Sequence, residues 1–421
     1  MSVAQSSPYV KSSRLLALDV FRGLTVALMI LVNSPGNKTA YSWLMHSSWH
    51  GCTLADFVFP FFIFMVGISL SFTLTKARTQ HASLQNLLQK ICKRSIALFL
   101  IGLALNLFPH FDFTTLRFFG VLQRIAICYF VASLLFLTTK PRTQLLISFF
   151  ILIAYWIMMT KIAIPVYGAN DLSQTGNVAA FVDRLLFSSS HLYGKVFDPE
   201  GLLSTLPAIA TALLGNLTGI WLLSVYSKKQ KLTGLYSIGA LLATTGWIWG
   251  IEFPINKALW TSSYVLWTGG MALLVLALCY WLIEIKAWQN WTEPFKVFGT
   301  NAMLAYVLHV FFLKVQAMIV LQHADGSSGN LKQWITDSMF GWAPLPMSSL
   351  LYAFSYTGLW LAILWIFISN KKNQLNLPST KHNCIILFSS EYTIDFFVKP
   401  VFDPQTKLCF FDNHEPQLSS K

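Results

Sequence analysis

The chain has 421 residues, of which 55% are hydrophobic, 15% are aromatic and only 11% are charged, and its formal net charge is +13. Soluble domains contain about 25% charged residues. This composition therefore excludes an ordinary soluble domain and indicates an integral membrane protein.

Ten stretches of the chain approach the length of about 20 apolar residues that a helix needs to cross a bilayer. They are too long for barrel strands, and a backbone in lipid must satisfy its own hydrogen bonds, so we expect helices. The predicted fold is an all-α polytopic membrane bundle with helices near residues 15–34, 54–75, 92–108, 119–138, 144–162, 203–226, 233–250, 263–284, 297–321 and 348–369.

Basic residues gather in alternate connections between the predicted helices, and the other connections are richer in acidic residues. Cytoplasmic loops are enriched in lysine and arginine, so this alternation places both termini in the cytoplasm and the 34–53 connection on the outer side. Topology and contact with membrane lipid explain the positive charge, and no nucleic-acid partner is expected. The basic connections hold Lys76, Arg78, Lys90, Lys93, Arg94, Lys140, Arg142, Lys228, Lys229, Lys231, Lys371 and Lys372.

The first predicted helix carries a polar stripe. Asp19 and Arg22 are three residues apart and share a helix face. At about 100° per residue, Asn33 falls close to the same line. Ionisable groups inside a membrane are costly and often functional. The stripe therefore either lines a path for a substrate or cofactor, or holds an ion pair that only neutralises itself.

The 34–53 connection and the start of the next helix supply His46, His50, Cys52 and Asp56. Their spacing matches no standard zinc pattern, so no metal is expected. His46 is a candidate general base or nucleophile near neutral pH, and a structural hydrogen-bonded histidine is the alternative. The six cysteines form no C-x-x-C pair, which argues against a disulfide framework.

Further polar residues lie near the ends of later helices, and each has a structural alternative. Arg124 either extends its charge to the membrane surface or belongs to a site. Asp198 and Glu200 either form a helix-capping turn or hold a substrate. Asn256 and Lys257 either anchor a helix end at the membrane surface or contact the substrate. His309 binds a neighbouring carbonyl or lines a path. Small residues at Gly215 and Gly219 favour close helix packing, and 322–347 is expected to be a loop.

Several motifs resemble the membrane acetyltransferases of the heparan-alpha-glucosaminide N-acetyltransferase family, which includes bacterial homologues. They occur in family order across residues 14–370. They are R-x-x-A-L-D-V-F-R-G-L-T at 14–25, V-N at 32–33, H-x-x-W-x-G-x-T-x-A-D-x-V-F-P at 46–60, F-G-V-L-Q-R-I-A at 119–126, D-P-E-G at 198–201, P-x-N-K-x-L-W at 254–260 and N-A-M-L-A-Y-V-L-H at 301–309.

The resemblance implies transfer of an acetyl group from cytoplasmic acetyl-CoA, across the membrane, to the amine of a glucosamine-type sugar. The family's essential histidine corresponds to His46, and the asparagine of its V-N element corresponds to Asn33. An imidazole suits the role of base or acyl carrier, and an amide N–H suits a developing oxyanion. Asp19, Arg22 and His309 are candidates for the acetyl-CoA path, with Arg22 meeting a phosphate. The substrate-binding candidates are Asp56, Arg124, Asp198, Glu200, Asn256 and Lys257.

These inferences divide the chain into an N-terminal segment 1–13 expected to be mobile, a transmembrane acyltransferase domain at 14–372, and an atypical tail at 373–421 without an assigned role. The expected location is the bacterial inner membrane, and a homodimer is compatible with the resemblance. A sugar permease or exporter with a polar translocation path is the alternative function. Such transporters commonly contain internal repeats, and none is evident here. Direct transfer, an acetyl-histidine intermediate and the identity of the acceptor are left open.

Overall fold

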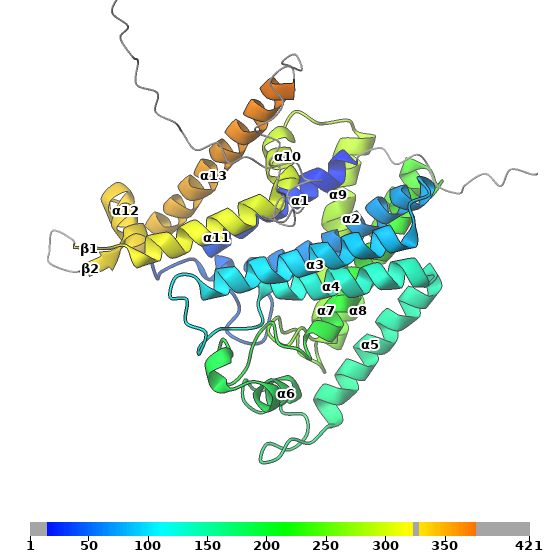
Figure 1. Ribbon diagram of the computed structural model, residues 1–421, viewed down its shortest axis with the longest axis horizontal. Coiled ribbons are helices and arrows are strands. Elements are labelled where there is room, and N and C mark those ends of the chain that lie inside the picture. The colour runs from blue at the N-terminus through cyan, green and yellow to red at the C-terminus, as the bar shows by residue number, and fades with distance from the viewer. Residues whose placement is uncertain (1–14, 323–327, 376–421) are drawn as a thin grey trace, which may run out of the picture.

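The computed structural model describes residues 15–322 and 328–375 (Figure 1). The expected N-terminal segment 1–13 and the tail beyond residue 375 lie outside the described residues. The helices are α1 (Leu16–Asn33), α2 (Val58–Thr79), α3 (Leu84–Leu107), α4 (Val121–Thr138), α5 (Pro141–Lys161), α6 (Val178–Leu186), α7 (Thr205–Leu223), α8 (Lys228–Trp249), α9 (Ser262–Tyr280), α10 (Glu293–Thr300), α11 (Ala302–Met318), α12 (Leu331–Phe340) and α13 (Leu345–Leu375).

Every one of the ten predicted apolar stretches is helical. Within the described residues, seven helices are long and apolar enough to cross a membrane, or eight if α10 and α11 form one broken span. The helices α3 and α8 reach 24 and 22 residues but are more polar, and they pack along the apolar helices α4 and α9. The predicted all-α polytopic membrane protein is therefore confirmed, whereas the side on which the termini lie stays a prediction.

Two local predictions are wrong. The single helix expected over 297–321 breaks at Asn301, and α10 and α11 meet there at a bend of 80°. Asn301 leaves the helical region at φ −121° and ψ 27°, and its side-chain amide donates to the carbonyl of Val297 at 3.0 Å, which caps the end of α10. The loop expected over 322–347 contains α12 and the strand β2 (Ser328–Asn330), which pairs antiparallel with β1 (Val320–Gln322).

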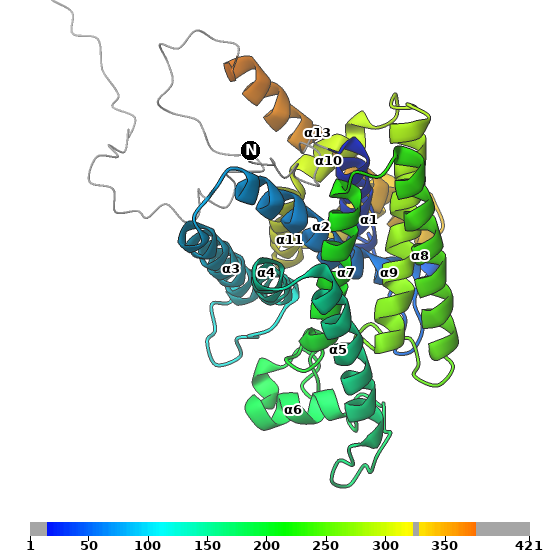
Figure 2. The same cartoon turned by 90° about the vertical axis from the view of Figure 1, so that its right-hand side faces the viewer.

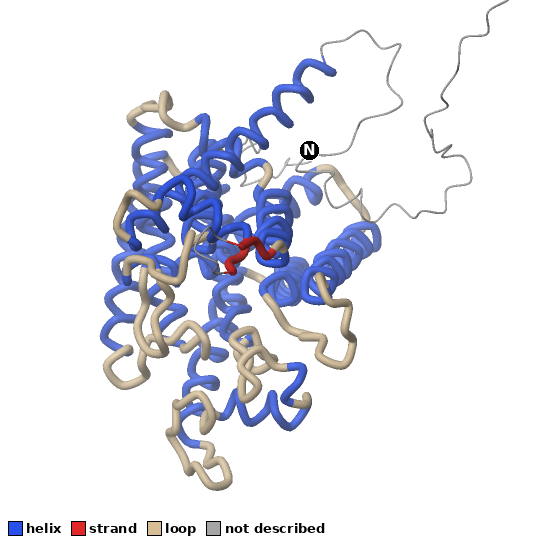
Figure 3. The backbone as a smooth tube through the Cα atoms, turned by 90° about the vertical axis from the view of Figure 1, so that its left-hand side faces the viewer, coloured by secondary structure: helices blue, strands red, loops and turns tan. Residues whose placement is uncertain are grey.

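The helices assemble around a central pair, α2 and α7 (Figure 2). The pair α8 and α9 lies on one side of it, and α3 and α4 lie on the other. The helix α1 packs against α10 and α13. Long connections extend from one end of the bundle and carry α6 (Figure 3). This arrangement leaves α1, α2, α3, α4 and α11 around a shared interior space.

Glycine allows the central pair to approach closely. A Cβ atom at Gly215 would lie 2.0 Å from the backbone oxygen of Phe64, and one at Gly67 would lie 2.0 Å from that of Ala212. Small residues are the usual means by which membrane helices bring their backbones into contact. Beside this contact, the Ser71 hydroxyl donates to the backbone oxygen of Asn216 at 2.9 Å. The packing role predicted for the small residues of α7 is confirmed.

We expect Gly215→Ala to lower the free energy of unfolding by about 1–3 kcal/mol, because the added methyl group overpacks the contact between α2 and α7. The measurement is the Tm of the purified protein in detergent. Gly358→Ala is the matched control, since no atom lies within 4 Å of its added Cβ. Equal Tm values for the two variants would contradict a close backbone contact at Gly215.

Candidate active site

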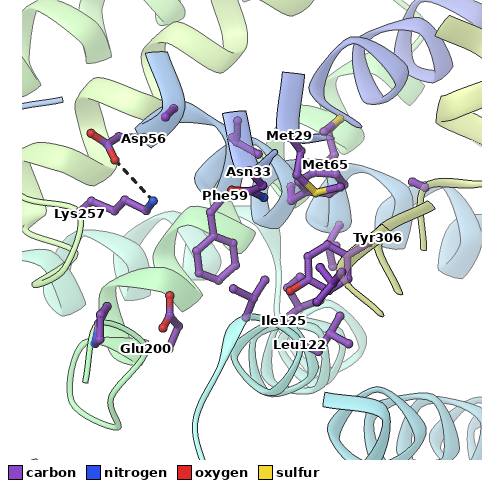
Figure 4. Close-up of a pocket in the computed structure, with 18 of the residues that line it drawn as sticks. Met29, Asn33, Asp56, Phe59, Met65, Leu122, Ile125, Glu200, Lys257 and Tyr306 are labelled. Carbon is purple, nitrogen blue, oxygen red and sulfur yellow. Dashed lines mark ion pairs between the residues drawn. The ribbon is translucent and has the colours of Figure 1, made fainter. Parts of the chain in front are cut away.

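A cavity of about 840 Å³ runs between the helices (Figure 4). Its walls carry polar groups at both ends and apolar side chains between them. One end holds Arg22, Ser69, Thr73 and Arg94, and the other holds His46, Asp56, Arg117, Glu200 and Lys257. The apolar section includes Met29, Phe59, Met65, Leu122, Ile125 and Tyr306. Arg22 and Asn33 are both in the wall and are separated by about 16 Å along α1, at 1.5 Å per residue.

His46 is joined to a buried carboxylate. Its Nδ1 lies 2.8 Å from Oδ1 of Asp56, which is fully buried, while the imidazole remains half-exposed toward the cavity. A carboxylate accepts hydrogen bonds, so this contact favours the tautomer that carries its proton on Nδ1 and makes Nε2 the acceptor atom of the ring. The sequence predicted His46 and Asp56 as site residues, and the structure brings them together.

The Asp56 carboxylate also organises the chain around it. Its Oδ2 accepts hydrogen bonds from the backbone N–H of Ser47 at 3.1 Å, and from the backbone N–H and hydroxyl of Thr53, each at 3.0 Å. The Thr53 and Asp56 side chains thereby form a capping box on the short 3-10 turn Leu54–Phe57 that precedes α2. Residue 46 is thus held in place by the same side chain that orients its ring.

Lys257 reaches this pair from the loop between α8 and α9. Its Nζ lies 3.4 Å from Oδ1 of Asp56, and 3.0 and 3.4 Å from Nδ1 and Nε2 of His46. Figure 4 shows the Lys257 side chain extending into the cavity beside Asp56. Burial lowers the pKa of Lys257, and the nearby Asp56 carboxylate opposes that shift. The position of Nζ makes Lys257 a hydrogen-bond donor next to the imidazole.

Asn256 holds this loop in position and does not line the cavity. Its side-chain oxygen accepts from the backbone N–H of Leu259 at 2.9 Å, and its amide nitrogen lies 3.3 Å from Nδ1 of His50. The backbone N–H of Gly51 also donates to the carbonyl of Ile255 at 2.7 Å. These contacts give Asn256 a structural role, joining the loop to the connection that carries His46.

Arg117 bridges the two carboxylates of the D-P-E-G motif. It donates to both oxygens of Asp198, at 2.8 and 2.5 Å, and to the carboxylate of Glu200. Burial works to lower the pKa of Arg117, but its contacts with the two carboxylates outweigh burial and hold the pKa above its ordinary value. Glu200 lines the cavity, whereas Asp198 lies behind it, fully buried.

Sequence reasoning did not select Arg117 as a site residue. Two features of the sequence could have indicated it. Arg117 is a basic residue in a predicted outer connection, where lysine and arginine are scarce, and another outer connection holds an acidic pair with no assigned partner. No spacing rule connects residues that are about 80 positions apart, so only the folded chain brings them together.

The opposite end of the cavity contains the predicted Asp19–Arg22 pair. Arg22 donates to Oδ1 of Asp19 at 3.3 Å, to the hydroxyl of Ser69 at 2.7 Å and to the backbone oxygen of Gly299 at 3.3 Å. Asp19 is buried behind the wall, whereas Arg22 is partly exposed to the cavity. Asn33, at the far end of α1, also lines the cavity.

Two predicted site residues lie outside the wall. Arg124 is buried on α4, where its guanidinium donates to Ser204 and lies 5.0 Å from the centre of the Trp260 ring. His309 is buried on α11, with Nδ1 3.0 Å from the carbonyl oxygen of Ala305. Neither side chain lines the cavity. The position of His309 agrees with the alternative stated for it, a hydrogen bond to a neighbouring carbonyl. Arg124 does not extend its charge to the membrane surface, because its side chain is buried and bonded within the protein.

Comparison with known proteins relates the chain to one family. The sequence model of the catalytic region of heparan-alpha-glucosaminide N-acetyltransferase matches residues 14–247, which is more than half of the chain. The chain is 32% identical over 363 residues to the heparan-alpha-glucosaminide N-acetyltransferase of Mus musculus, and 31% identical over 363 residues to that of Homo sapiens. Each alignment covers 71% of this chain and 53% of the relative, so the chain spans about half the length of these curated relatives.

A buried carboxyl in the segment that supports the D-P-E-G turn gives a pH-dependent prediction. Burial raises the pKa of Asp183 from 3.8 to about 6, although its Oδ1 accepts from the backbone N–H of Leu202. Because the folded protein holds this proton more tightly than the unfolded chain, the stabilisation is complete below about pH 4 and is lost as the pH rises through about 6. The difference corresponds to roughly 3 kcal/mol.

We therefore expect Asp183→Asn to be more stable than the wild type at pH 7.5 and to lose this part of the dependence of Tm on pH between about 4 and 6. Thermal unfolding in detergent across that range measures both effects. Glu252→Gln, at an exposed carboxyl in another loop, is the control and leaves the pH profile of the wild type unchanged. If Tm of Asp183→Asn changed with pH as that of the wild type does, the raised pKa assigned to Asp183 would be contradicted.

Proposed function

The chain belongs to the heparan-alpha-glucosaminide N-acetyltransferase family, and we propose that it transfers an acetyl group from acetyl-CoA to the amine of a glucosamine-type sugar. The observation that carries this proposal is the His46–Asp56 pair at one end of a cavity whose other end holds basic side chains. A base and a route for a thioester therefore share one space.

His46 acts as the base in this reaction. The sugar amine attacks the thioester carbonyl, a C–N bond forms, and Nε2 accepts the proton that the nitrogen loses. The C–S bond then breaks, and the thiolate of CoA leaves and takes up a proton. The hydrogen bond from Nδ1 to Asp56 stabilises the imidazolium that forms, as in other carboxylate–histidine pairs. In the alternative mechanism, Nε2 attacks the thioester carbonyl and the thiolate of CoA leaves. The sugar amine then attacks the acetyl-imidazole, the amide C–N bond forms, and the bond to Nε2 breaks as the amine proton passes to the imidazole.

Lys257 and Asn33 supply donors for the oxygen that becomes negative during attack. The Lys257 ammonium lies beside the imidazole, and the Asn33 amide lies in the wall of the same cavity. Donors fixed near a developing oxyanion stabilise the transition state more than the ground state. Arg22 binds a phosphate of CoA at the opposite end, and the apolar section accommodates the extended chain that carries the thioester.

The two ends of the cavity correspond to the two sides of the membrane in this proposal. The positive-inside pattern supports an orientation with the Arg22 end toward the cytoplasm, where acetyl-CoA is made, and the His46 end toward the outer side. The acceptor sugar therefore arrives from the outer side. A permease would also need a polar path, but it gives no role to a histidine held by a buried carboxylate.

Replacing His46 by alanine removes the base, and we expect kcat for acetylation of glucosamine to fall by about 10²–10⁴-fold. The assay uses purified protein in lipid vesicles with labelled acetyl-CoA and measures acetylated product. His110→Ala, at an exposed loop histidine outside the cavity, is the control and retains wild-type activity. Wild-type turnover by His46→Ala would exclude this role, and sugar transport without acetylation would favour the permease.

Replacing Arg22 by glutamine removes the charge that binds the phosphate. We expect the KM for acetyl-CoA to rise about tenfold or more, since hydrogen bonds to charged groups contribute about 1.5–3 kcal/mol. The KM for glucosamine stays constant. Arg142→Gln, at an exposed arginine on α5, is the control. An unchanged KM for acetyl-CoA in a folded Arg22→Gln protein would exclude the phosphate contact.

A further inference from the structure

We propose that the ring of Phe59 limits the size of the acyl group that the protein transfers, so that acetyl-CoA is preferred over thioesters with longer straight chains. This inference rests on the proposed acetyl transfer and adds a selection among donors that the transfer itself does not require. It follows from the position of the ring in the cavity, from the side chains that fix it and from the ion pairs at the His46 end.

The Phe59 ring lies where the apolar section of the cavity meets the His46 end. Phe59 follows Asp56 by three residues, so the two side chains lie about one helical turn apart on the same side of the chain. Both line the cavity, and the Asp56 carboxylate binds His46. Figure 4 shows the ring between the Lys257 side chain and the apolar side chains around Tyr306. A thioester that reaches His46 through the apolar section therefore brings its acyl group next to this ring.

Packing on the side away from the cavity fixes the ring. The Phe59 side chain meets the Trp260 ring edge to face, with the ring centres 5.0 Å apart. Trp260 is fully buried, its indole N–H donates to the Thr211 hydroxyl at 3.1 Å, and the Tyr264 ring packs on it at 5.3 Å. Only 6% of Phe59 is exposed. Close-packed interiors leave a side chain little room to move, so the ring forms a fixed wall for a ligand.

Ion pairs form much of the remaining wall at the His46 end. Lys257 lies 3.4 Å from Asp56, and Arg117 is paired with Glu200. An alkyl chain laid against these pairs would remove water from charged groups without replacing its hydrogen bonds, which is costly. The single methyl group of acetyl avoids most of this cost, whereas each added CH₂ group must lie against the ion pairs or against the Phe59 ring.

Two aromatic side chains also line this end and offer apolar surface. They are Trp49 and Phe197, whose rings lie 5.2 Å apart. Both belong to connections outside the long helices, on the side from which the sugar arrives in the proposed reaction. An acyl chain laid against them would occupy the space that the acceptor needs. A longer chain therefore competes either with the Phe59 ring or with the second substrate.

The test compares acetyl-CoA, propionyl-CoA and butyryl-CoA as donors to glucosamine, with the full-length protein in lipid vesicles. We expect kcat/KM to fall by about tenfold or more from acetyl-CoA to butyryl-CoA, since a pocket distinguishes one CH₂ group by about 10–200-fold. Equal use of acetyl-CoA and butyryl-CoA would overturn this inference while the proposed acetyl transfer stands. Transfer from none of the three donors would overturn both.

One substitution locates the selection at the ring. Phe59→Leu removes part of the wall, and we expect the ratio of kcat/KM for butyryl-CoA to that for acetyl-CoA to rise about tenfold. Because the ratio compares two donors in one preparation, it does not depend on the fraction of folded protein. Phe59→Met, whose flexible side chain can move aside, is a second variant for the same comparison.

The matched control is Phe61→Leu. Phe61 is on the same helix and is similarly buried at 8% exposure, but it does not line the cavity, and its ring packs against Phe21 at 5.4 Å. We expect its donor ratio to equal that of the wild type. An unchanged ratio in both Phe59 variants, or an equal rise in Phe61→Leu, would contradict the role of Phe59.

Discussion

The buried Asp56 carboxylate is the interaction on which the site depends. A charged group without partners is costly to bury, and this one is compensated by two backbone N–H groups, a hydroxyl, an imidazole and a nearby ammonium. These partners come from the connection after α1, the turn before α2 and the loop after α8. Folding must bring the three segments together to satisfy one side chain, and doing so places His46 at the end of the cavity.

Helix packing produces the cavity that His46 and Asp56 adjoin. Close contact of α2 with α7 through Gly67 and Gly215 draws those two backbones together. The helices α1, α3, α4 and α11 stand around α2, and the interior between them is filled by side chains only in part. The bend between α10 and α11 brings the backbone oxygen of Gly299 within hydrogen-bonding distance of Arg22. The break in that helix therefore contributes a polar contact to the end of the cavity opposite His46.

Charge pairing differs between the two ends and gives the cavity a direction. At the Arg22 end, two arginines line the wall, and the Asp19 carboxylate lies behind it. At the His46 end, two carboxylates, those of Asp56 and Glu200, line the wall together with the cations Arg117 and Lys257, and aromatic rings lie beside them. The unequal charge of the two ends favours an anionic ligand at the Arg22 end, which suits the proposed transfer from a phosphate-bearing thioester.

The sequence by itself determined the fold class, the helical character of the ten predicted stretches and the family, and it marked His46, Asp56 and Arg22 as site candidates. It could do so because lipid imposes helix-length apolar runs and makes each polar exception conspicuous. Only the tertiary structure showed that Arg117 meets Asp198 and Glu200, that Asn301 interrupts a helix, and that Arg124, Asn256 and His309 lie outside the cavity wall. The reason is physical. Periodicity records which side of a helix is polar, but whether a buried polar group faces a cavity or a neighbouring carbonyl depends on segments far away in the chain, whose approach no local pattern encodes.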